Sequence, residues 1–290
     1  MRIGLGTNRL RRTPENVDLV RRAVVAGIGM VDTAHTYTDG ESEATIGEAL
    51  SPRPDGLVVA TKGGFAPGTG GAEALSAQID ESLRRLRTNT IDLYYLHRVD
   101  PETPLEESLA TIAEYRDRGQ IRHVGLSEVG IEQLERGRQV VPIVAVQNRY
   151  NLAERTNEDV IDHCAQQGIA FVPFFPLRGT DAPAVAEIAA RHGASPQQVA
   201  LAWLLARSPA MLPIPGTLSL DHVEQNLAAF ELELSEDELD ILVERDAKFG
   251  NLLIVGDIAR QHQRVVERGR KFAHVLLEPW TGIRECEAGT

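Results

Sequence analysis

Short apolar segments recur along the chain, and several are nearly continuous runs rather than alternating ones. Eight such segments are found, at residues 3–7, 28–34, 57–62, 91–97, 122–127, 143–148, 169–175 and 211–215. Continuous apolar runs of this length are typical of parallel strands that are covered on both faces. The pattern therefore predicts eight buried parallel strands.

Segments with helical periodicity lie between these apolar runs. Thr13 suits the N-cap of the first helix and Pro14 suits its first turn. Similar patterns predict further helices at residues 73–86, 104–119, 157–168 and 195–208. A Ser195 to Gln198 capping box opens the last of them. Glycines stand where four helices should end, at Gly27, Gly119, Gly168 and Gly193.

The alternation of strands and helices predicts an α/β fold. Eight right-handed βαβ units at a typical length of about 250 residues favour a closed (β/α)8 TIM barrel. A doubly wound Rossmann sheet is the main alternative, but residues 4–9, GLGTNR, lack the third glycine of its phosphate-binding motif. We therefore expect a single barrel domain over residues 1–290.

The end of the chain, about residues 249–290, is predicted to be a C-terminal extension of that barrel. Apolar positions suggest another helix there, at Ile258, Val265, Val266, Phe272, Val275 and Leu276. Such a helical tail has three open roles: packing on the barrel, covering a site, or meeting a second subunit.

Composition and charge narrow the class of protein. The chain is 42% hydrophobic and 25% charged, as in a soluble globular protein, and its formal net charge of −12 argues against nucleic acid as a partner. Cys164 and Cys286 are far apart in the chain and have no neighbouring metal-ligand pattern, so we expect no metal site. No apolar run approaches the roughly 18 residues of a membrane span, and the N-terminus does not resemble a secretion signal. A cytoplasmic protein fits these features.

Four ionisable side chains stand at or just after the ends of successive predicted strands. Asp32 ends the second strand and Tyr37 follows in its loop, while Lys62 ends the third strand and His97 the fourth. Singly, each has a structural interpretation, as a cap, a half-buried aromatic, a surface cation or a core histidine. In a barrel the carboxyl ends of the strands form one mouth, so the four groups should converge. A phenol, a cation, a carboxylate and an imidazole together are suited to proton transfer.

The same segments give the chain a strong resemblance to the aldo-keto reductase family. The motifs VDTAHTYTDGESE, VVATKGG, IDLYYLHRVDP, RHVGLS, VQNRYNL, PFFPL and IPGT appear in family order. The resemblance implies a nicotinamide-dependent oxidoreductase that reduces an aldehyde or ketone to an alcohol. It implies that Tyr37 is the general acid, that Lys62 lowers the proton affinity of Tyr37, that Asp32 orients Lys62, and that His97 positions the carbonyl.

The resemblance also implies a cofactor groove across the barrel mouth for NADP(H), with NAD(H) as the alternative. Ser127 and Gln147 would bind the nicotinamide carboxamide, and Phe174 would stack on its ring. The loop under the pyrophosphate would begin at Pro176 and Leu177, and the adenosine end would lie near Gly216, Thr217, His222, Gln225 and Asn226.

The chain departs from the family pattern in three respects. Glu128 stands where asparagine is usual, and a carboxylate can accept a hydrogen bond from the carboxamide but cannot donate one. Gly216 and His222 replace the lysine and arginine that grip a 2′-phosphate, although Arg178 and Thr217 could supply part of that site. Gln225 replaces a frequent glutamate and keeps an acceptor oxygen.

Substrate contacts are expected from the loops after the early strands and from the tail. The candidates are Phe65, Arg98, Val99 and Trp280, and Arg98 either contacts a substrate anion or pairs with nearby Asp100. The motifs are most similar to a bacterial branch that includes pyridoxal reductases, which favours a small, heteroaromatic carbonyl substrate. Two other functions stay open: a cofactor-binding regulatory or sensor barrel, and a biosynthetic enzyme for a specialised metabolite. The sequence does not distinguish a monomer from a homo-oligomer.

Overall fold

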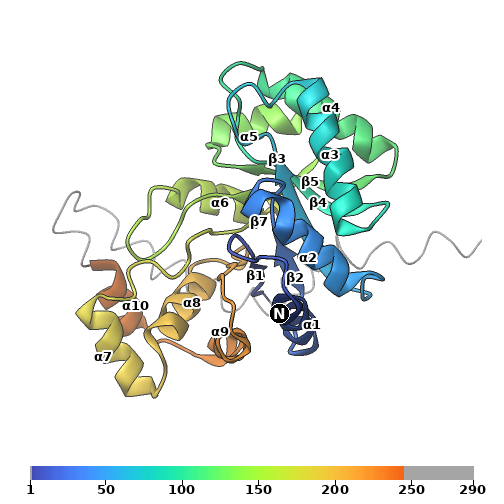
Figure 1. The fold of residues 1–290 in the computed structure, drawn as a ribbon. Coiled ribbons are helices and arrows are strands. Elements are labelled where there is room, and N and C mark those ends of the chain that lie inside the picture. Colours follow the sequence, from blue (N-terminus) through green and yellow to red (C-terminus); the bar gives the residue numbers. More distant parts are fainter. Residues whose placement is uncertain (1, 245–290) are drawn as a thin grey trace, which may run out of the picture.

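A seven-stranded parallel sheet forms the centre of the molecule, and its strands follow one another in chain order (Figure 1). The structure, a computed structural model, describes residues 2–244. The strands are β1 (Leu5–Gly6), β2 (Met30–Asp32), β3 (Val58–Gly63), β4 (Ile91–Leu96), β5 (Ile121–Ser127), β6 (Ile143–Gln147) and β7 (Ala170–Phe171). Seven of the eight predicted strands are thus confirmed, and five of these seven are shorter than predicted.

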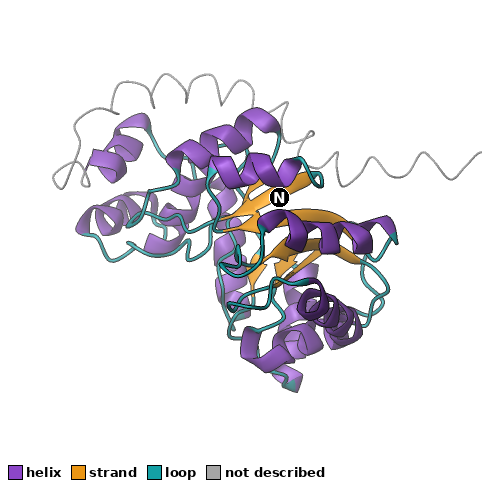
Figure 2. Cartoon of the chain, turned by 90° about the horizontal axis from the view of Figure 1, so that it is seen from above, coloured by secondary structure: helices purple, strands orange, loops and turns teal. Residues whose placement is uncertain are grey.

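Helices lie outside the strands and connect each one to the next (Figure 2). They are α1 (Pro14–Val25), η1 (Tyr37–Gly40), α2 (Glu41–Leu50), α3 (Ala72–Leu86), α4 (Leu105–Asp117), α5 (Ile131–Arg138), α6 (Glu158–Gln167), α7 (Pro183–His192), α8 (Pro196–Arg207), α9 (Leu220–Ala228), η2 (Ala229–Glu231) and α10 (Glu236–Glu244). None of the helices within residues 2–244 is both long enough and apolar enough to cross a membrane.

The eighth predicted strand is present as an extended segment rather than as a regular strand. Its Leu212 N–H donates to β7 at 2.9 Å, while the carbonyls of Pro213 and Pro215 accept from Gly4 at 2.9 Å and from Gly6 at 3.1 Å. The segment therefore joins β7 to β1 and closes the sheet on itself. Proline has no N–H to donate, so Pro213 and Pro215 can only accept hydrogen bonds in the ladder toward β1.

The helix signals in the sequence act as expected. The Thr13 side chain accepts a hydrogen bond from the Asn16 N–H at 3.3 Å, and both bonds of the Ser195 to Gln198 capping box form, at 3.2 and 2.9 Å. All four predicted terminating glycines have a positive φ, at Gly27, Gly119, Gly168 and Gly193. These local signals fix the lengths of the helices before any packing is considered.

Two apolar clusters flank the sheet because successive strand residues point to opposite faces. The larger one lies between the strands and the helices. The smaller one fills the inner face with Met30, Ala60, Leu93, Tyr95 and Ala145. The predicted extension at 249–290, including Trp280, lies outside the described residues, and the single-domain assignment stays a prediction.

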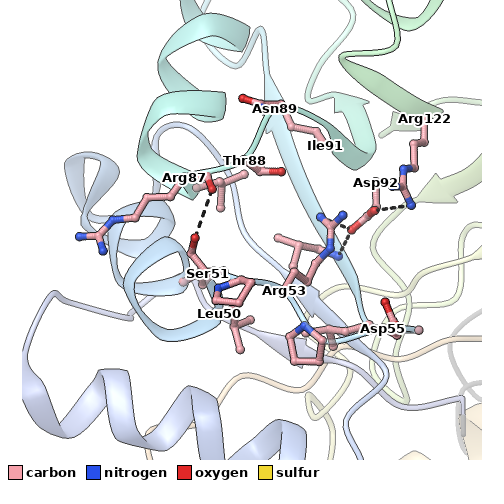
Figure 3. A pocket seen from close by; sticks show the side chains of 17 residues that line it. Leu50, Ser51, Arg53, Asp55, Arg87, Thr88, Asn89, Ile91, Asp92 and Arg122 are labelled. Carbon is pink, nitrogen blue, oxygen red and sulfur yellow. Dashed lines mark hydrogen bonds and ion pairs between the residues drawn. The ribbon is translucent and has the colours of Figure 1, made fainter.

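A cavity of about 420 Å³ lies at the amino ends of β3 and β4 (Figure 3). Buried Asp92 accepts the Val59 N–H at 2.9 Å and pairs with Arg53 at 2.7 Å and with Arg122 at 3.6 Å. Figure 3 shows both guanidinium groups directed at this carboxylate. The three ionic groups connect the segment after α2 to β4 and β5, so this end of the barrel is held together electrostatically.

Candidate active site

A second cavity, of about 670 Å³, lies at the opposite end of the strands, where their carboxyl ends meet. It brings together residues from all parts of the predicted site: Asp32, Tyr37, Phe65, His97, Arg98, Ser127, Gln147, Phe174, Pro176, Leu177, Arg178 and Gly216. Within residues 2–244, no group of three or more His, Cys, Asp or Glu side chains is placed to hold a metal ion.

Beneath this cavity lies a fully buried ion pair. Lys62 Nζ is 2.5 Å from Asp32 Oδ1 and donates a second hydrogen bond to the Thr33 carbonyl at 2.6 Å. Gln147 Nε2 donates to the other Asp32 oxygen at 2.9 Å. Both Asp32 oxygens thus have a donor, as a buried carboxylate requires. The arrangement also connects the ends of β2, β3 and β6.

The pKa of Lys62 reflects a competition between burial and charge. Burial by itself lowers this pKa. The Asp32 carboxylate and Tyr37 raise it by more than burial lowers it, so the pKa of Lys62 lies above its ordinary value. Lys62 is therefore an ammonium ion at neutral pH, although its side chain has no exposed surface. Its Nζ lies 5.0 Å from the centre of the Tyr37 ring. A fixed positive charge thus stands directly behind the phenol.

The Tyr37 loop is anchored from behind by a second buried network. Arg85 Nη1 donates to the His35 carbonyl at 3.0 Å and lies 3.3 Å from the fully buried Glu43 carboxylate. The Thr61 hydroxyl, next to Lys62 in β3, donates to the other Glu43 oxygen at 2.6 Å. The network fixes the loop relative to β3, and with it the position of Tyr37 relative to the ammonium group.

His97 is a neutral group in this site. Burial, followed by the charges of Lys62 and Arg98, lowers the pKa of His97 to about 2. Its ring centre lies 6.0 Å from that of Tyr37, at an interplanar angle of 78°, and 4.8 Å from that of Phe65. At neutral pH the imidazole therefore acts as a hydrogen-bonding group and carries no charge.

Aromatic rings and arginines line the far side of the cavity. Phe174 is partly buried and Phe175 is 41% exposed, with a left-handed φ of 52°. The Arg149 guanidinium lies 5.5 and 5.6 Å from these two ring centres, and that of Arg178 lies 4.8 Å from Phe175. Cations at these distances from ring faces are attracted to them, so the rings and guanidinium groups hold one another in place.

Glu128 does not line the cavity. Its φ is 58°, and its carboxylate pairs with Arg98 at 2.9 Å and accepts the Arg149 N–H at 3.0 Å. Asp100, the other predicted partner of Arg98, instead accepts two backbone N–H groups of residues 68–70, at 3.0 and 2.6 Å. The expected contact of Glu128 with a carboxamide is not favoured by this orientation.

The residues predicted for the adenosine end form a group beside the cavity. Thr217 and Asn226 are buried, whereas His222 and Gln225 are exposed on α9. The Thr217 hydroxyl lies 3.3 Å from His222 Nδ1. None of the four lines the cavity as the structure describes it.

Several cavity residues escaped the sequence interpretation: Thr7, Asn8, Arg9, Arg149 and Phe175. Arg9 Nη2 donates to the Gly216 carbonyl at 3.4 Å, and the Thr7 hydroxyl donates to the Asp32 carbonyl at 2.8 Å. Thr7 ends the first predicted strand and Arg9 follows it closely. That position is the signal that could have identified them, because every loop at that end of a barrel faces the mouth.

At the mouth of the closed parallel sheet lie a phenol, a buried ammonium–carboxylate pair and a neutral imidazole, a set of groups suited to proton transfer. A model of the aldo/keto reductase family matches residues 2–247. The chain therefore belongs to the aldo/keto reductase family, as its motifs predicted.

Relatives and solved structures agree with this assignment. An uncharacterized oxidoreductase of Schizosaccharomyces pombe is 41% identical over 232 residues, which are 75% of this chain and 74% of the relative. Pyridoxine 4-dehydrogenase of Escherichia coli K12 is 38% identical over 243 residues, covering 78% of this chain and 85% of the relative. An aldo/keto reductase of Klebsiella pneumoniae, solved with NADP and acetate, has a TM-score of 0.76 at 30% identity, with 87% and 93% of the two chains covered.

Proposed function

We propose that the protein reduces an aldehyde or ketone to an alcohol with NADPH, and that Tyr37 donates the proton. The observation that supports this most is the buried Lys62–Asp32 pair directly behind the ring of Tyr37, beneath a cavity that is also lined by the neutral His97. These groups have the chemistry that protonation of a carbonyl oxygen requires.

Each side chain has a distinct part in this proposal. The Tyr37 O–H gives its proton to the carbonyl oxygen, and the Lys62 ammonium stabilises the phenolate that remains. Asp32 holds Lys62 in place through the contact at 2.5 Å. His97, being neutral, donates a hydrogen bond to the same carbonyl oxygen without competing as an acid. Tyr37 is partly exposed, so solvent returns its proton after product leaves.

The cavity suits a nicotinamide dinucleotide, which when bound supplies the hydride. Ser127 and Gln147 are polar groups at its floor, and Phe174 offers a ring face for stacking. Two guanidinium groups, those of Arg9 and Arg178, line the same cavity and would attract phosphates. NADP(H) is the cofactor that this charge favours, and the K. pneumoniae relative was solved with NADP. NAD(H) is the alternative, because Gly216 and His222 stand where the family has a lysine and an arginine for the 2′-phosphate.

The substrate we propose is a small aromatic or heteroaromatic carbonyl compound. Tyr37, Phe65 and His97 present three rings to the cavity. Flat side chains of this kind pack well against a flat substrate. The E. coli relative is named for activity on pyridoxine, a heteroaromatic alcohol, which agrees with this class.

The test is consumption of NADPH and of NADH at 340 nm with pyridoxal and a panel of simple aldehydes and ketones. Turnover by the wild type and its loss in Tyr37→Phe are expected. Tyr115→Phe is the matched control, because that phenol lies on α4 outside the cavity, where its hydroxyl donates to Ser76 and Asp80 of α3. Absence of turnover with every carbonyl would contradict the proposal.

A further inference from the structure

Arg98 occupies a sensitive position at the mouth of the cavity. It follows His97 directly in the chain and lines the cavity, and its guanidinium lies 5.8 Å from the centre of the Phe65 ring. Its side chain is 38% exposed. An uncompensated guanidinium at this place would attract anionic compounds toward His97 and Tyr37.

Glu128 holds this guanidinium in one place. One carboxylate oxygen pairs with Arg98 at 2.9 Å, and the other accepts the Arg149 N–H at 3.0 Å. Because both oxygens are engaged, the carboxylate has little freedom to turn. Glu128 thereby connects three consecutive strand ends, those of β4, β5 and β6.

The backbone at Glu128 has a left-handed conformation, which is a second sign that this side chain is held in a defined position. A φ of 58° is uncommon for a residue other than glycine, asparagine or aspartate, and it requires support from the surroundings. Two bonds from neighbouring strand ends supply that support. The Glu128 carboxylate is thus built into the strand ends and is not a loose surface group.

Charges are balanced around the carbonyl-binding groups and are unbalanced elsewhere in the cavity. Near Tyr37, the Lys62 ammonium is paired with the Asp32 carboxylate and the Arg98 guanidinium is paired with that of Glu128. His97 is neutral. By contrast, no carboxylate pairs with Arg9 or Arg178 in the described part of the chain. The positive excess therefore lies on the side where the cofactor phosphates are proposed to bind.

We infer that Glu128 is a positioning and specificity-determining residue, which fixes Arg98 and cancels its charge so that uncharged carbonyl compounds are preferred over anionic ones. The inference rests on the proposed function and adds to it the charge of the substrate. It also explains why a glutamate stands here in place of the family's usual asparagine. The Glu128 carboxylate acts on Arg98 at the substrate side of the mouth and not on the nicotinamide.

The test compares a matched pair of substrates, benzaldehyde and 4-carboxybenzaldehyde, which differ by one carboxylate. The measured quantity is kcat/KM for the anionic aldehyde divided by kcat/KM for the neutral one. In Glu128→Gln this ratio should rise about tenfold, which corresponds to ~1.4 kcal/mol, because the guanidinium loses its counter-charge. The glutamine keeps an acceptor for the Arg149 N–H, so the loop stays supported.

Two further variants complete a double-mutant cycle. Arg98→Gln leaves the Glu128 carboxylate alone at the mouth, so the ratio should fall below that of the wild type. In the double variant both charges are gone, and the ratio should return to within about twofold of the wild type. Added salt should reduce the rise in Glu128→Gln, because the charge is partly exposed.

The outcomes separate this inference from the proposed function. An unchanged ratio in Glu128→Gln, with both aldehydes turned over, would overturn the role of Glu128 and leave the reductase intact. Should Glu128→Gln fail to fold, Arg98→Gln decides alone, and an unchanged ratio there would also overturn it. Absence of wild-type turnover with both aldehydes and with the panel above would contradict the proposed function itself, and the inference with it.

Discussion

The two ends of the barrel each contain a cavity with a buried aspartate beside cations, yet only one end has the means for proton transfer. At the carboxyl end, Asp32 pairs with Lys62, and Tyr37 and His97 line the cavity above that pair. At the amino end, Asp92 pairs with Arg53 and Arg122. A guanidinium remains protonated at all ordinary pH values, so the second arrangement can hold charges together but has no proton to give.

The comparison shows that a buried ion pair alone does not indicate a catalytic site. What distinguishes the carboxyl end is a hydroxyl group that is partly exposed and faces an ammonium group that is fully buried. At the amino end both cations reach solvent, with side-chain exposures of 21% for Arg53 and 53% for Arg122. The following changes should affect the two ends differently.

The largest effect is expected from Lys62→Met. Turnover should fall by about 10³-fold or more, because the phenolate left after proton transfer loses its stabilising charge. The free energy of unfolding should also fall by about 3–5 kcal/mol, because Asp32 keeps a buried charge without a counter-ion. Steady-state kinetics and urea unfolding measure the two effects. Full activity in this variant would show that the Lys62–Asp32 pair has only a structural role, like the ion pairs of Asp92 at the amino end.

Asp92→Asn is the counterpart at the amino end. It should lower the free energy of unfolding by about 1–3 kcal/mol, less than Lys62→Met, because Arg53 and Arg122 can turn toward water. The asparagine retains an oxygen to accept the Val59 N–H. Turnover should stay within about twofold of the wild type. A large loss of turnover without a loss of stability would show that the amino end also contributes to catalysis, which contradicts the distinction drawn between the two ends.

The pH dependence of stability reports on His97. Its pKa in the folded protein is lowered to about 2, below the ordinary value of 6.5. The unfolded chain therefore binds a proton at this position first as the pH falls. The contribution of His97 to stability is complete above pH 6.5 and is lost progressively between pH 6.5 and about 2.

His97→Gln should remove this dependence, because glutamine does not titrate. The slope of the unfolding free energy against pH below 6.5 should decrease by about 1.4 kcal/mol per pH unit relative to the wild type. Urea unfolding of both proteins at several pH values between 6.5 and 4.5 measures this slope. Equal slopes in the two proteins would show that the imidazole is already protonated in the folded state.

The smallest effect expected is on cofactor affinity. Arg178→Gln should raise the KM for NADPH about tenfold and leave that for NADH nearly unchanged, because only NADPH carries the 2′-phosphate. Arg22→Gln is the matched control, because this arginine is exposed on α1 and lies outside the cavity. Equal increases for both cofactors would instead place Arg178 at the pyrophosphate.

The sequence was most informative where short-range rules apply. Apolar runs and capping signals located the strands and helices, and the order of strand ends was enough to predict that Asp32, Lys62 and His97 meet at one mouth. These predictions succeed because the carboxyl ends of parallel strands lie together whatever the loops do. The prolines at 213 and 215 made the last strand irregular without preventing closure.

Positions that depend on loop conformation could not be predicted in the same way. The direction of Glu128 is decided by a left-handed φ and by a partner thirty positions away in the chain, Arg98. Arg9 and Arg149 reach the cavity only because the sheet closes and brings the loops after β1 and β6 toward its centre. Such contacts are properties of the closed barrel and not of any local segment.

The most direct measurement is the transient rate of NADPH oxidation in Tyr37→Phe, with NADPH affinity determined by fluorescence on the same preparation. The rate should fall by at least about 10²-fold, because the proton donor is gone, while the dissociation constant of NADPH stays within about twofold of the wild type. A rate within about threefold of the wild type, at unchanged NADPH affinity, would contradict the assignment of Tyr37 as the proton donor.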